Sequence, residues 1–324
     1  MATYKGIQGY TVQNLASDPT ASSDTEGQLW YNNSTGKFKV VEAGLGAWAA
    51  GGDLGTARYF IVGVGTQTAA LGVGGNSPST ANESYDGTTW TEVGDVANSR
   101  KNASGTAGTQ TAAIIYGTAP AIALVEEWNG TSWTEIADIN TSRQYCSAST
   151  AGTTTAALCF GGGPSTPGST SNESWNGTTW TEVADLNFAR YRSTGAGTST
   201  AAIVSGDANA PEEDKSETWN GTSWTAAADL NAGGYAMGGA GTQTAAWVVG
   251  GAPYAKRNPS STAATEHFNG TAWTELANVA IQLEGSGGVG TTTAGLTMGG
   301  MPAPIISSYE WNDPVYTVKT VTVS

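Results

Sequence analysis

Glutamates recur in this sequence in pairs that could carry out acid–base chemistry. One member lies just before an aromatic residue (Glu127, Glu217 and Glu310), and the other follows a tryptophan (Glu92, Glu135, Glu182 and Glu275). Two carboxylates that flank a glycosidic bond are the catalytic groups of glycoside hydrolases. The pair returns about every 45 residues, however, whereas an enzyme needs one active site. We therefore expect these glutamates to make turn and cross-strand hydrogen bonds, and we assign no catalytic residue.

One acidic cluster is not repeated. Glu212, Glu213 and Asp214 follow Asp207 in a segment whose sequence differs in every repeat. A loop without support is a poor place to hold catalytic geometry. We expect these three residues to contact a ligand or partner rather than to catalyse a reaction.

Arginine stands at an equivalent position in four repeats, before the first strand that we expect in each. These residues are Arg58, Arg100, Arg143 and Arg190. A ring of guanidinium groups around a central channel would bind an anion. The alternative is that each arginine caps the preceding turn, whose aspartate is Asp53, Asp95, Asp138 or Asp185. In the fifth repeat Gly233-Gly234 replaces the arginine, which favours the capping role.

The composition argues against several classes of function. The 324 residues include 13 Lys+Arg and 27 Asp+Glu, a formal net charge of −14, so the chain lacks the basic surface that nucleic-acid binding requires. No apolar run approaches the roughly 20 residues of a membrane span, and we expect no signal peptide at the N-terminus. One histidine, His267, and two cysteines, Cys146 and Cys159, argue against a metal site or a disulfide framework. We expect no cofactor, and we expect His267 to be a solvated strand residue.

Two motifs repeat along the chain with a mean period of 45 residues. The string Gly-Thr-x-Thr-Ala-(Ala/Gly) begins at Gly65, Gly108, Gly152, Gly197, Gly241 and Gly290. About twenty residues later comes a second motif, for example EEWNGTSWTEI from Glu126 and ETWNGTSWTAA from Glu217. A fixed period of this size indicates a repeat architecture.

Each period predicts four short strands. In one period they cover residues 190–195, 200–205 and about 217–219, and the last begins at Trp224. Asn220-Gly221 favours the positive-φ geometry of a tight hairpin. Four short strands in a period of this length are typical of a propeller blade.

These residues resemble the kelch repeat family over about residues 58–324. The likeness consists of a glycine pair that ends an apolar strand, such as Gly161-Gly162, then an aromatic residue and then a tryptophan. The resemblance implies an all-β, kelch-like β-propeller. The repeats predict six four-stranded blades, with seven as the second choice. Kelch functions do not transfer with the fold, because propellers host unrelated activities.

The aromatic residues of the second motif also recur in pairs. The pairs are Tyr85/Trp90, Trp128/Trp133, Trp175/Trp180, Trp219/Trp224 and Phe268/Trp273. Such rings could form a sugar-stacking surface. Since one pair occurs in almost every repeat, we expect packing between blades instead.

The two ends of the chain allow two ways to close the ring. Residues 46–58 match the outgoing half of a repeat, so one blade could combine strands from both chain ends. Alternatively, residues 316–324 could complete the last blade. We divide the chain into an N-terminal arm or linker (1–27), N-terminal strands that could close the ring (28–57) and a propeller (58–324).

The segments between the second and third strands vary in length and charge while the framework stays constant. The longest spans residues 252–264 and carries Tyr254, Lys256 and Arg257. Divergent loops on a rigid scaffold are typical of binding modules. These three residues are the leading contact candidates.

The segment EGQLWYNNSTGKFKVVEAG (26–44) is similar to a short element of structural proteins of tailed bacteriophages. The WNGTxWTE repeats are similar to virion proteins of marine and environmental phages. The resemblance implies a virion protein made in the host cytoplasm: a tail fibre, tail-tip adhesin or capsid decoration. Residues 1–57 would contact other virion proteins, and the variable loops would contact a host-surface glycan or protein or neighbouring subunits. Two other hypotheses stay open, a glycan-processing enzyme on a propeller scaffold and a cellular kelch-type interaction protein, and so does formation of a homo-oligomer.

Overall fold

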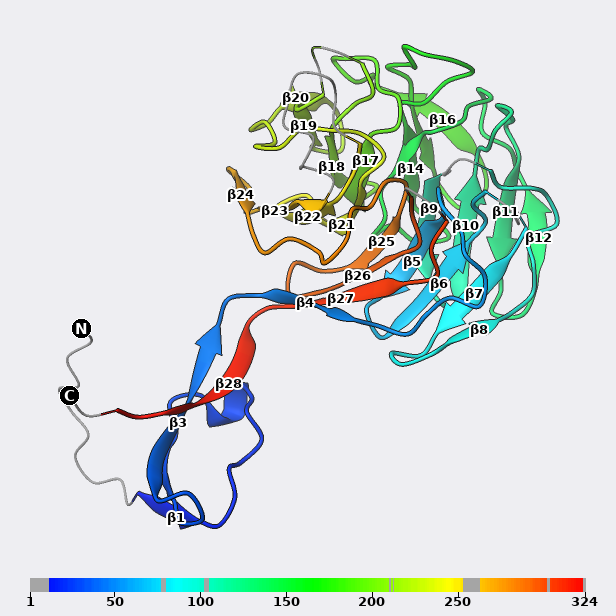
Figure 1. Cartoon of the computed structure of the whole chain (residues 1–324). Helices are drawn as coiled ribbons and strands as arrows, with labels where there is room; N and C mark the ends of the chain where they lie inside the picture. Colours follow the sequence, from blue (N-terminus) through cyan, green and yellow to red (C-terminus); the bar gives the residue numbers. More distant parts are fainter. Residues whose placement is uncertain are drawn as a thin grey trace. The chain divides into compact units, whose positions relative to one another are not determined.

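The computed structural model describes residues 12–76, 80–101, 105–209, 211, 213–252, 263–301 and 304–322. Within these ranges the chain is all-β, with seven four-stranded sheets and one short 3-10 helix (Figure 1). It divides into two compact units, Trp48–Asn312 and a smaller unit made of Met1–Ala47 and Asp313–Ser324. The sequence placed the boundaries after residues 27 and 57 and gave the C-terminal end to the propeller, which differs from this division. No helix in the described ranges is long and apolar enough to cross a membrane.

The larger unit holds six of the sheets, each named here by its first strand. The first strands are β5 (Val62–Thr66), β9 (Gly105–Thr109), β13 (Ser147–Ala148), β17 (Thr194–Thr198), β21 (Gly238–Thr242) and β25 (Gly287–Gly290). The second strands are β6 (Ala69–Val73), β10 (Ala112–Tyr116), β14 (Ala157–Phe160), β18 (Ala201–Ser205), β22 (Ala245–Val249) and β26 (Ala294–Met298). The third strands are β7 (Asn82–Tyr85), β11 (Val125–Trp128), β15 (Asn172–Trp175), β19 (Ser216–Trp219), β23 (Thr265–Phe268) and β27 (Ser308–Asn312). The fourth strands are β8 (Trp90–Glu92), β12 (Trp133–Ile136), β16 (Trp180–Val183), β20 (Trp224–Ala226), β24 (Trp273–Glu275) and, for the β25 sheet, β4 (Ala47–Ala50).

The repeated motifs form the turns between these strands. In the β5 sheet, Gly65 has φ 115°, and a Cβ there would lie 2.2 Å from the carbonyl oxygen of Ala69, so only glycine fits the Gly-Thr turn. In the β9 sheet, the Asn129 side-chain oxygen accepts hydrogen bonds from the N–H groups of Thr131 and Ser132, both at 3.0 Å. The sequence thus fixes both hairpins of a repeat through local chemistry.

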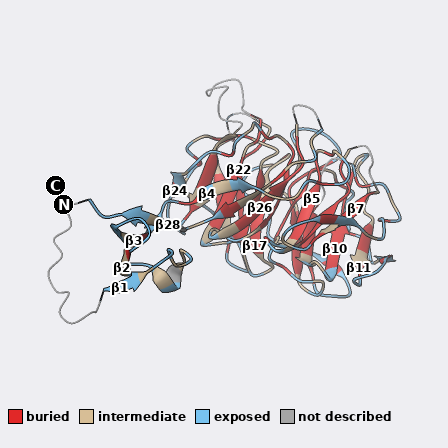
Figure 2. Cartoon of the chain, turned by 60° about the horizontal axis from the view of Figure 1, so that its bottom comes forward, coloured by how far each residue is buried: buried red, intermediate tan, exposed pale blue. Residues whose placement is uncertain are grey.

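The first strands of neighbouring sheets contact one another. The contacts follow the order β5, β9, β13, β17, β21 and β25, and β25 contacts β5 again. The apolar cluster shared by the β25 and β5 sheets includes Ile61, Leu296 and Met298. The Gln67 side chain donates a hydrogen bond to the carbonyl oxygen of Trp311 (2.7 Å), which joins the same two sheets. This arrangement of four-stranded sheets is propeller-like, and its buried residues concentrate in the strands (Figure 2).

The paired aromatic residues lie in this packing. Their ring centroids are 4.8–5.5 Å apart, and the tryptophans that open the fourth strands are 5–9% exposed. Trp180 also meets Tyr116 of the preceding sheet edge-on at 5.0 Å. The predicted packing role is confirmed, and a sugar-stacking surface made of these pairs is not present.

The chain ends pair in two different places. Strand β4 lies beside β27 in the β25 sheet, so that sheet combines strands from distant parts of the sequence. This is the first of the two predicted alternatives. The second is wrong, because the C-terminal strand β28 (Val315–Thr320) pairs antiparallel with β3 (Lys37–Gly44) of the smaller unit.

The smaller unit is a sheet in the order β1-β2-β3-β28, with β1 (Gln13–Leu15), β2 (Leu29–Asn32) and the 3-10 helix η1 (Ser23–Thr25). Trp30 is 1% exposed and donates its indole N–H to the Asp18 carboxylate (3.0 Å). Part of the predicted arm is therefore a parallel edge strand, β1, rather than a linker.

Candidate functional site

The four framework arginines are buried. Their guanidinium groups form ion pairs with glutamates of the third strand in the same sheet: Arg58–Glu83, Arg100–Glu126, Arg143–Glu173 and Arg190–Glu217. The arginine side chains are 0–1% exposed and the glutamates 0–4%. Each arginine also donates to backbone carbonyls, as Arg58 does to Gly74 and Ala81 (2.9 and 2.8 Å). This geometry contradicts the predicted anion-binding ring. The capping alternative also fails, because the arginines reach glutamates and not the turn aspartates.

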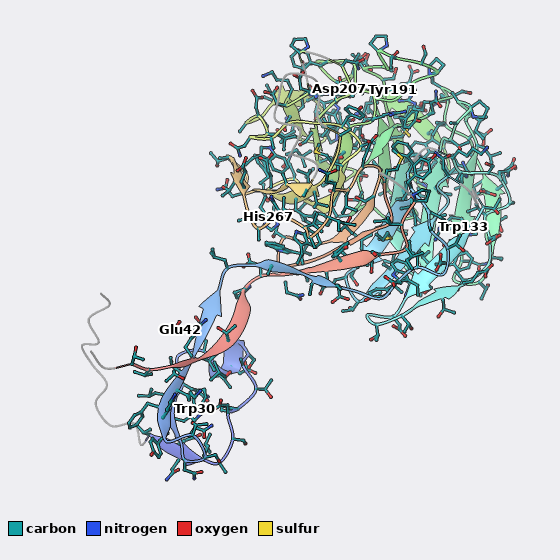
Figure 3. All side chains as sticks on the ribbon, viewed as in Figure 1. Trp30, Glu42, Trp133, Tyr191, Asp207 and His267 are labelled. Carbon is teal, nitrogen blue, oxygen red and sulfur yellow. The ribbon has the colours of Figure 1, made fainter. Side chains whose placement is uncertain are left out.

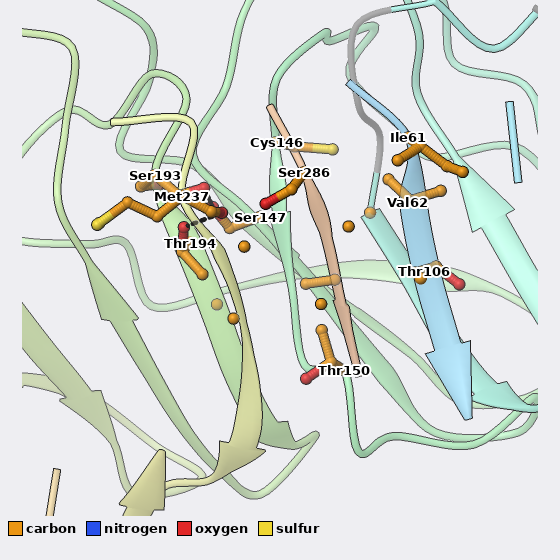
Figure 4. A pocket seen from close by; sticks show the side chains of 18 residues that line it. Ile61, Val62, Thr106, Cys146, Ser147, Thr150, Ser193, Thr194, Met237 and Ser286 are labelled. Atoms are coloured by element: carbon orange, nitrogen blue, oxygen red, sulfur yellow. Dashed lines mark hydrogen bonds between the residues drawn. The ribbon is translucent and has the colours of Figure 1, made fainter. Parts of the chain in front are cut away.

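The centre of the larger unit is lined by small neutral residues. Two cavities of about 90 and 70 Å³ lie among the first strands and are bordered mainly by glycine, serine, threonine and alanine. Thr194 donates its hydroxyl to the Met237 carbonyl and Ser147 to that of Ser193, both at 2.8 Å (Figure 4). The described part of this lining contains no charged side chain.

Most of the predicted loop contacts cannot be placed. Tyr254, Lys256, Arg257 and Glu212 lie outside the described residues. Glu213 is 8% exposed, and its carbonyl accepts the Gly234 N–H (2.8 Å). The Asp214 carboxylate lies 3.4 Å from the Lys215 amine. The Asp214 carbonyl accepts the Leu230 N–H (2.8 Å). Main-chain hydrogen bonds of Glu213 and Asp214 therefore hold their loop against residues 230–234.

The repeated outer glutamates and the single histidine do not gather into a site. Glu92, Glu135, Glu182 and Glu275 are exposed on the fourth strands. His267 is half-buried with its ring 5.1 Å from that of Trp311, not a solvated residue as predicted. In the described ranges no three His, Cys, Asp or Glu side chains are grouped so as to hold a metal ion.

A different set of residues comes together where the chain enters the first strands. Phe60, Tyr145, Arg192 and Ala236 occupy equivalent positions in four repeats and have φ between 51° and 62°. They are the only non-glycine residues with positive φ in the described ranges. Such a backbone costs of order 1–3 kcal/mol for a bulky residue, so the surrounding structure must hold it in place.

Backbone hydrogen bonds between sheets supply this restraint. The N–H of Phe60 donates to Gly285 (2.6 Å), that of Gly285 to Ala236 (2.7 Å), and that of Ala236 to Arg192 (2.8 Å). The series continues from the Arg192 N–H to the Tyr145 carbonyl (3.4 Å). These hydrogen bonds connect neighbouring sheets at one end of the first strands. They also bring the side chains at the positive-φ positions close to one another.

The result is a cluster of aromatic rings around one cation, which we call the mouth cluster: Phe60, Tyr145, Tyr191, Arg192 and Tyr235. The Arg192 guanidinium carbon lies 4.3 Å from the centre of the Tyr145 ring, 5.1 Å from that of Phe60 and 5.9 Å from that of Tyr235. The guanidinium also donates to the Tyr145 hydroxyl (2.9 Å). Burial raises the pKa of Tyr145, and Arg192 acts against this rise.

The mouth cluster borders a hollow of about 510 Å³. Tyr191, Arg192 and Tyr235 line it together with Gln144, Ala208 and residues 164–166. The last two belong to variable segments of the sequence, 207–215 and 162–171. Backbone bridges connect the variable segments to the residues that precede the positive-φ positions. Examples are Gln144–Gly163, at the start of segment 162–171, and Tyr59–Asn76, at the start of another variable segment. Variable loops and mouth cluster therefore share one face of the larger unit.

Asp207 lies beside Tyr191 (Figure 3). It is fully buried, and one carboxylate oxygen accepts the Tyr191 N–H and the Asn209 side-chain N–H, both at 2.9 Å. The other oxygen has no hydrogen-bond partner among the described residues. Burial raises the pKa of Asp207 to about 6, while the Tyr191 N–H acts in the opposite direction.

Sequence reasoning identified the face but not these residues. Arg192 differs from the framework arginines only by standing two positions after one of them, and nothing in its neighbours indicates positive φ. One feature of the sequence does single out Arg192: no other repeat has a positively charged residue at the equivalent position in the described ranges. No protein-family model matches the chain, and no curated protein sequence matches it.

Proposed function

We propose that the chain is a non-enzymatic binding module on a closed, six-bladed, kelch-like β-propeller. Support for closure comes from the cyclic order of contacts between the first strands and from the hydrogen bond of Gln67 to Trp311. The six sheets would be the blades, and β4 would complete the last one. In a closed propeller the remaining sheet edges are short and protected, which limits aggregation through edge strands.

The observation that carries the binding role is the mouth cluster. Arg192, which has no ion pair among the described residues, is held among aromatic rings beside a hollow on the face that also bears the variable loops. Concave sites with apolar walls and a few fixed polar groups are typical of ligand binding. The framework is constant from repeat to repeat, so binding specificity would be set by the loops.

We further propose that the protein is a structural component of a tailed-bacteriophage virion, either a tail fibre, a tail-tip adhesin or a capsid decoration. The support is the similarity of residues 26–44 and of the WNGTxWTE repeats to such proteins. The smaller unit, which holds residues 26–44, would bind other virion proteins, and the larger unit would bind the host surface or a neighbouring subunit.

Two experiments test these proposals separately. Mass spectrometry and cryo-electron microscopy of virions from a phage that encodes the chain should place it in the particle, with a six-sheet unit exposed at the surface. Its absence from purified particles would exclude the virion role. Binding of the fluorescently labelled chain to host cells tests the adhesin role, with unlabelled chain as competitor.

A glycan-processing enzyme is the second candidate, and Asp207 is the observation that favours it. A buried carboxyl with a pKa of about 6 is suited to proton transfer near neutral pH. Glycoside hydrolysis needs a second carboxylate across the bond, and the described lining of the hollow contains none. Release of reducing ends from host polysaccharide by the purified chain, abolished in Asp207→Asn, would favour the enzyme over the binding module.

A further inference from the structure

Arg192 differs from the other described arginines in its electrostatic environment. Arg58, Arg100, Arg143 and Arg190 each have a carboxylate partner, whereas Arg192 takes part in no ion pair within the described ranges. It is half-buried, and its Nε atom is buried without a hydrogen-bond partner there. Arg192 shares the unpartnered Nε with Arg58 and Arg190. What sets Arg192 apart is the lack of a carboxylate partner in the described ranges, which an anionic ligand bound to its terminal nitrogens would supply.

The geometry of Arg192 is fixed before any ligand arrives. Its guanidinium group lies against the Tyr145 and Phe60 rings, and its hydrogen bond to the Tyr145 hydroxyl limits rotation. The backbone hydrogen bonds on either side hold the residue at φ 62°. A pre-organised guanidinium fork recognises a carboxylate or a similar planar anion through two parallel hydrogen bonds.

The rest of the hollow is suited to a sugar ring rather than to a peptide. Tyr191 and Tyr235 line it with aromatic residues, and Gln144, Ser165 and Thr166 line it with an amide and two hydroxyls. The Gln144 amide N–H also donates to the Pro164 carbonyl (3.0 Å). The backbone groups are already used: Tyr235 and Ala252 exchange hydrogen bonds, as do Gln144 and Gly163. A peptide main chain would therefore find few partners, whereas sugar hydroxyls can bond to side chains while the apolar face of the ring stacks on tyrosine.

The size of the hollow agrees with this class of ligand. Its volume of about 510 Å³ falls within the range of about 300–1,000 Å³ that small-ligand sites occupy. The lining carries one cation and no carboxylate in the described ranges, so one negative charge on the ligand is matched.

We infer that the mouth cluster binds an acidic saccharide, with the sugar carboxylate on the Arg192 guanidinium and the ring beside Tyr191 and Tyr235. This inference deepens the proposed binding function and rests on it. The negatively charged neighbour that opposes such a ligand is Glu284, whose carboxylate interacts electrostatically with Arg192 without forming an ion pair.

The test is calorimetric titration of the full chain with tetragalacturonate and with its methyl ester, which differs only in charge. Wild-type protein is expected to bind the acid at least about tenfold more tightly than the ester, the usual contribution of a charge-assisted hydrogen-bonded pair. Arg192→Gln is expected to lose this preference, and Arg192→Lys to keep part of it, because lysine retains the charge without the fork. Glu284→Gln is expected to tighten binding of the acid by roughly twofold to fivefold.

Matched variants separate binding from folding. Lys319→Gln removes an exposed positive charge from the smaller unit and is expected to leave affinity unchanged. Ser165→Trp fills the hollow from an exposed position and is expected to block both ligands, which tests the site even if Arg192→Gln fails to fold.

Three results would overturn the inference: equal affinity for acid and ester, unchanged affinity in a folded Arg192→Gln, or tighter binding of an acidic decapeptide that displaces the sugar. A chain that binds host cells or is found in virions but ignores tetragalacturonate would refute the acidic-saccharide inference alone. Failure of cell binding together with absence from virions would count against the proposed function instead.

Discussion

The six sheets of the larger unit have the same four-stranded backbone, but different residues occupy two equivalent positions, one before the first strand and one in the third strand. Four of them bury an arginine against a glutamate. In the β21 sheet Gly234 takes the arginine position, and Glu266 accepts N–H groups from Asn231 and Ala232 at 2.8 Å. The glutamates that have an arginine accept similar bonds, as Glu217 does from the Asn187 N–H (2.8 Å), so the β21 sheet keeps these bonds and lacks the ion pair. In the β25 sheet Leu283 and Tyr309 replace both charged residues.

This comparison indicates that the ion pair is one option and not a requirement of the fold. A buried pair gains little over apolar residues of similar size, because two charges must leave water. Once one charge is buried, however, its partner becomes necessary. The ion pair therefore adds little to the stability of each sheet. Its main effect is to limit which substitutions the sheet tolerates.

The largest expected effect follows from removing one partner. Arg58→Leu leaves the Glu83 carboxylate buried with the Gly55 N–H (2.6 Å) as its remaining donor in the described ranges. We expect the free energy of unfolding to fall by about 3–5 kcal/mol. Chemical denaturation at pH 7 measures it.

A double variant makes the comparison between sheets direct. Arg58→Leu/Glu83→Tyr copies Leu283 and Tyr309 of the β25 sheet, and it should be more stable than Arg58→Leu by at least about 1–2 kcal/mol because no charge stays buried alone. If the double variant were as unstable as the single one, the two sheets would not be interchangeable solutions.

A smaller effect distinguishes the glutamates of two sheets. Glu126 accepts hydrogen bonds from the Arg100 Nε and an Arg100 terminal nitrogen at 3.2 and 2.8 Å, whereas the donors to Glu266 among the described residues are neutral N–H groups. Glu126→Gln should lower the free energy of unfolding by about 2–3 kcal/mol, and Glu266→Gln by about 1 kcal/mol, since hydrogen bonds to charged groups are the stronger ones. Equal losses, measured under the same denaturation conditions, would show that the charge of Arg100 is not what Glu126 balances.

Much of the repeat could be predicted from the sequence, because its determinants are local. The Gly-Thr and Asn-Gly turns require glycine at positive φ, and alternating apolar residues give the strands. The predicted first strand, 190–195, begins too early, however, since β17 covers Thr194–Thr198. Arg190 is occupied by its ion pair and Arg192 has positive φ, so the chain bends there before it becomes extended.

The mouth cluster could not be predicted, because it depends on contacts between repeats. The hydrogen bond from the Ala236 N–H to the Arg192 carbonyl joins residues 44 positions apart, and no local sequence pattern predicts it. The pairing of β28 with β3 is also non-local, since an alternating segment such as residues 316–324 suits more than one sheet edge. What the sequence did indicate is that loops on one face vary while the framework does not.

Asp207 is a buried carboxyl group that forms no ion pair with an arginine in the described ranges, so the pH dependence of stability can be compared with that of the paired glutamates. Burial raises the pKa of Asp207 from 3.8 to about 6, so the folded protein binds more protons than the unfolded one between these values. Stability from this group is therefore present at low pH and is lost as pH rises through about 4 to 6. Asp207→Asn lacks the ionisation, and its stability relative to wild type should rise by up to about 3 kcal/mol between pH 3.5 and pH 7. A difference that does not change with pH would mean that folding leaves the pKa of Asp207 at its ordinary value.

The smallest effect is expected at Asp86, where the sign is reversed. Asp86 holds the turn position that asparagine holds in the next four repeats, and its carboxylate accepts the N–H groups of Thr89 and Thr88 at 2.8 and 2.9 Å. These bonds lower its pKa below 3.8, the Thr89 N–H contributing most, so its stabilisation is present at neutral pH and is lost as pH falls through the lowered pKa. Asp86→Asn should match wild type in melting temperature at pH 7 and exceed it only in strong acid, because the amide oxygen keeps the same two bonds, as Asn129 does. A pH profile of Asp86→Asn with the same direction as that of Asp207→Asn would show that burial, and not turn hydrogen bonding, governs both aspartates.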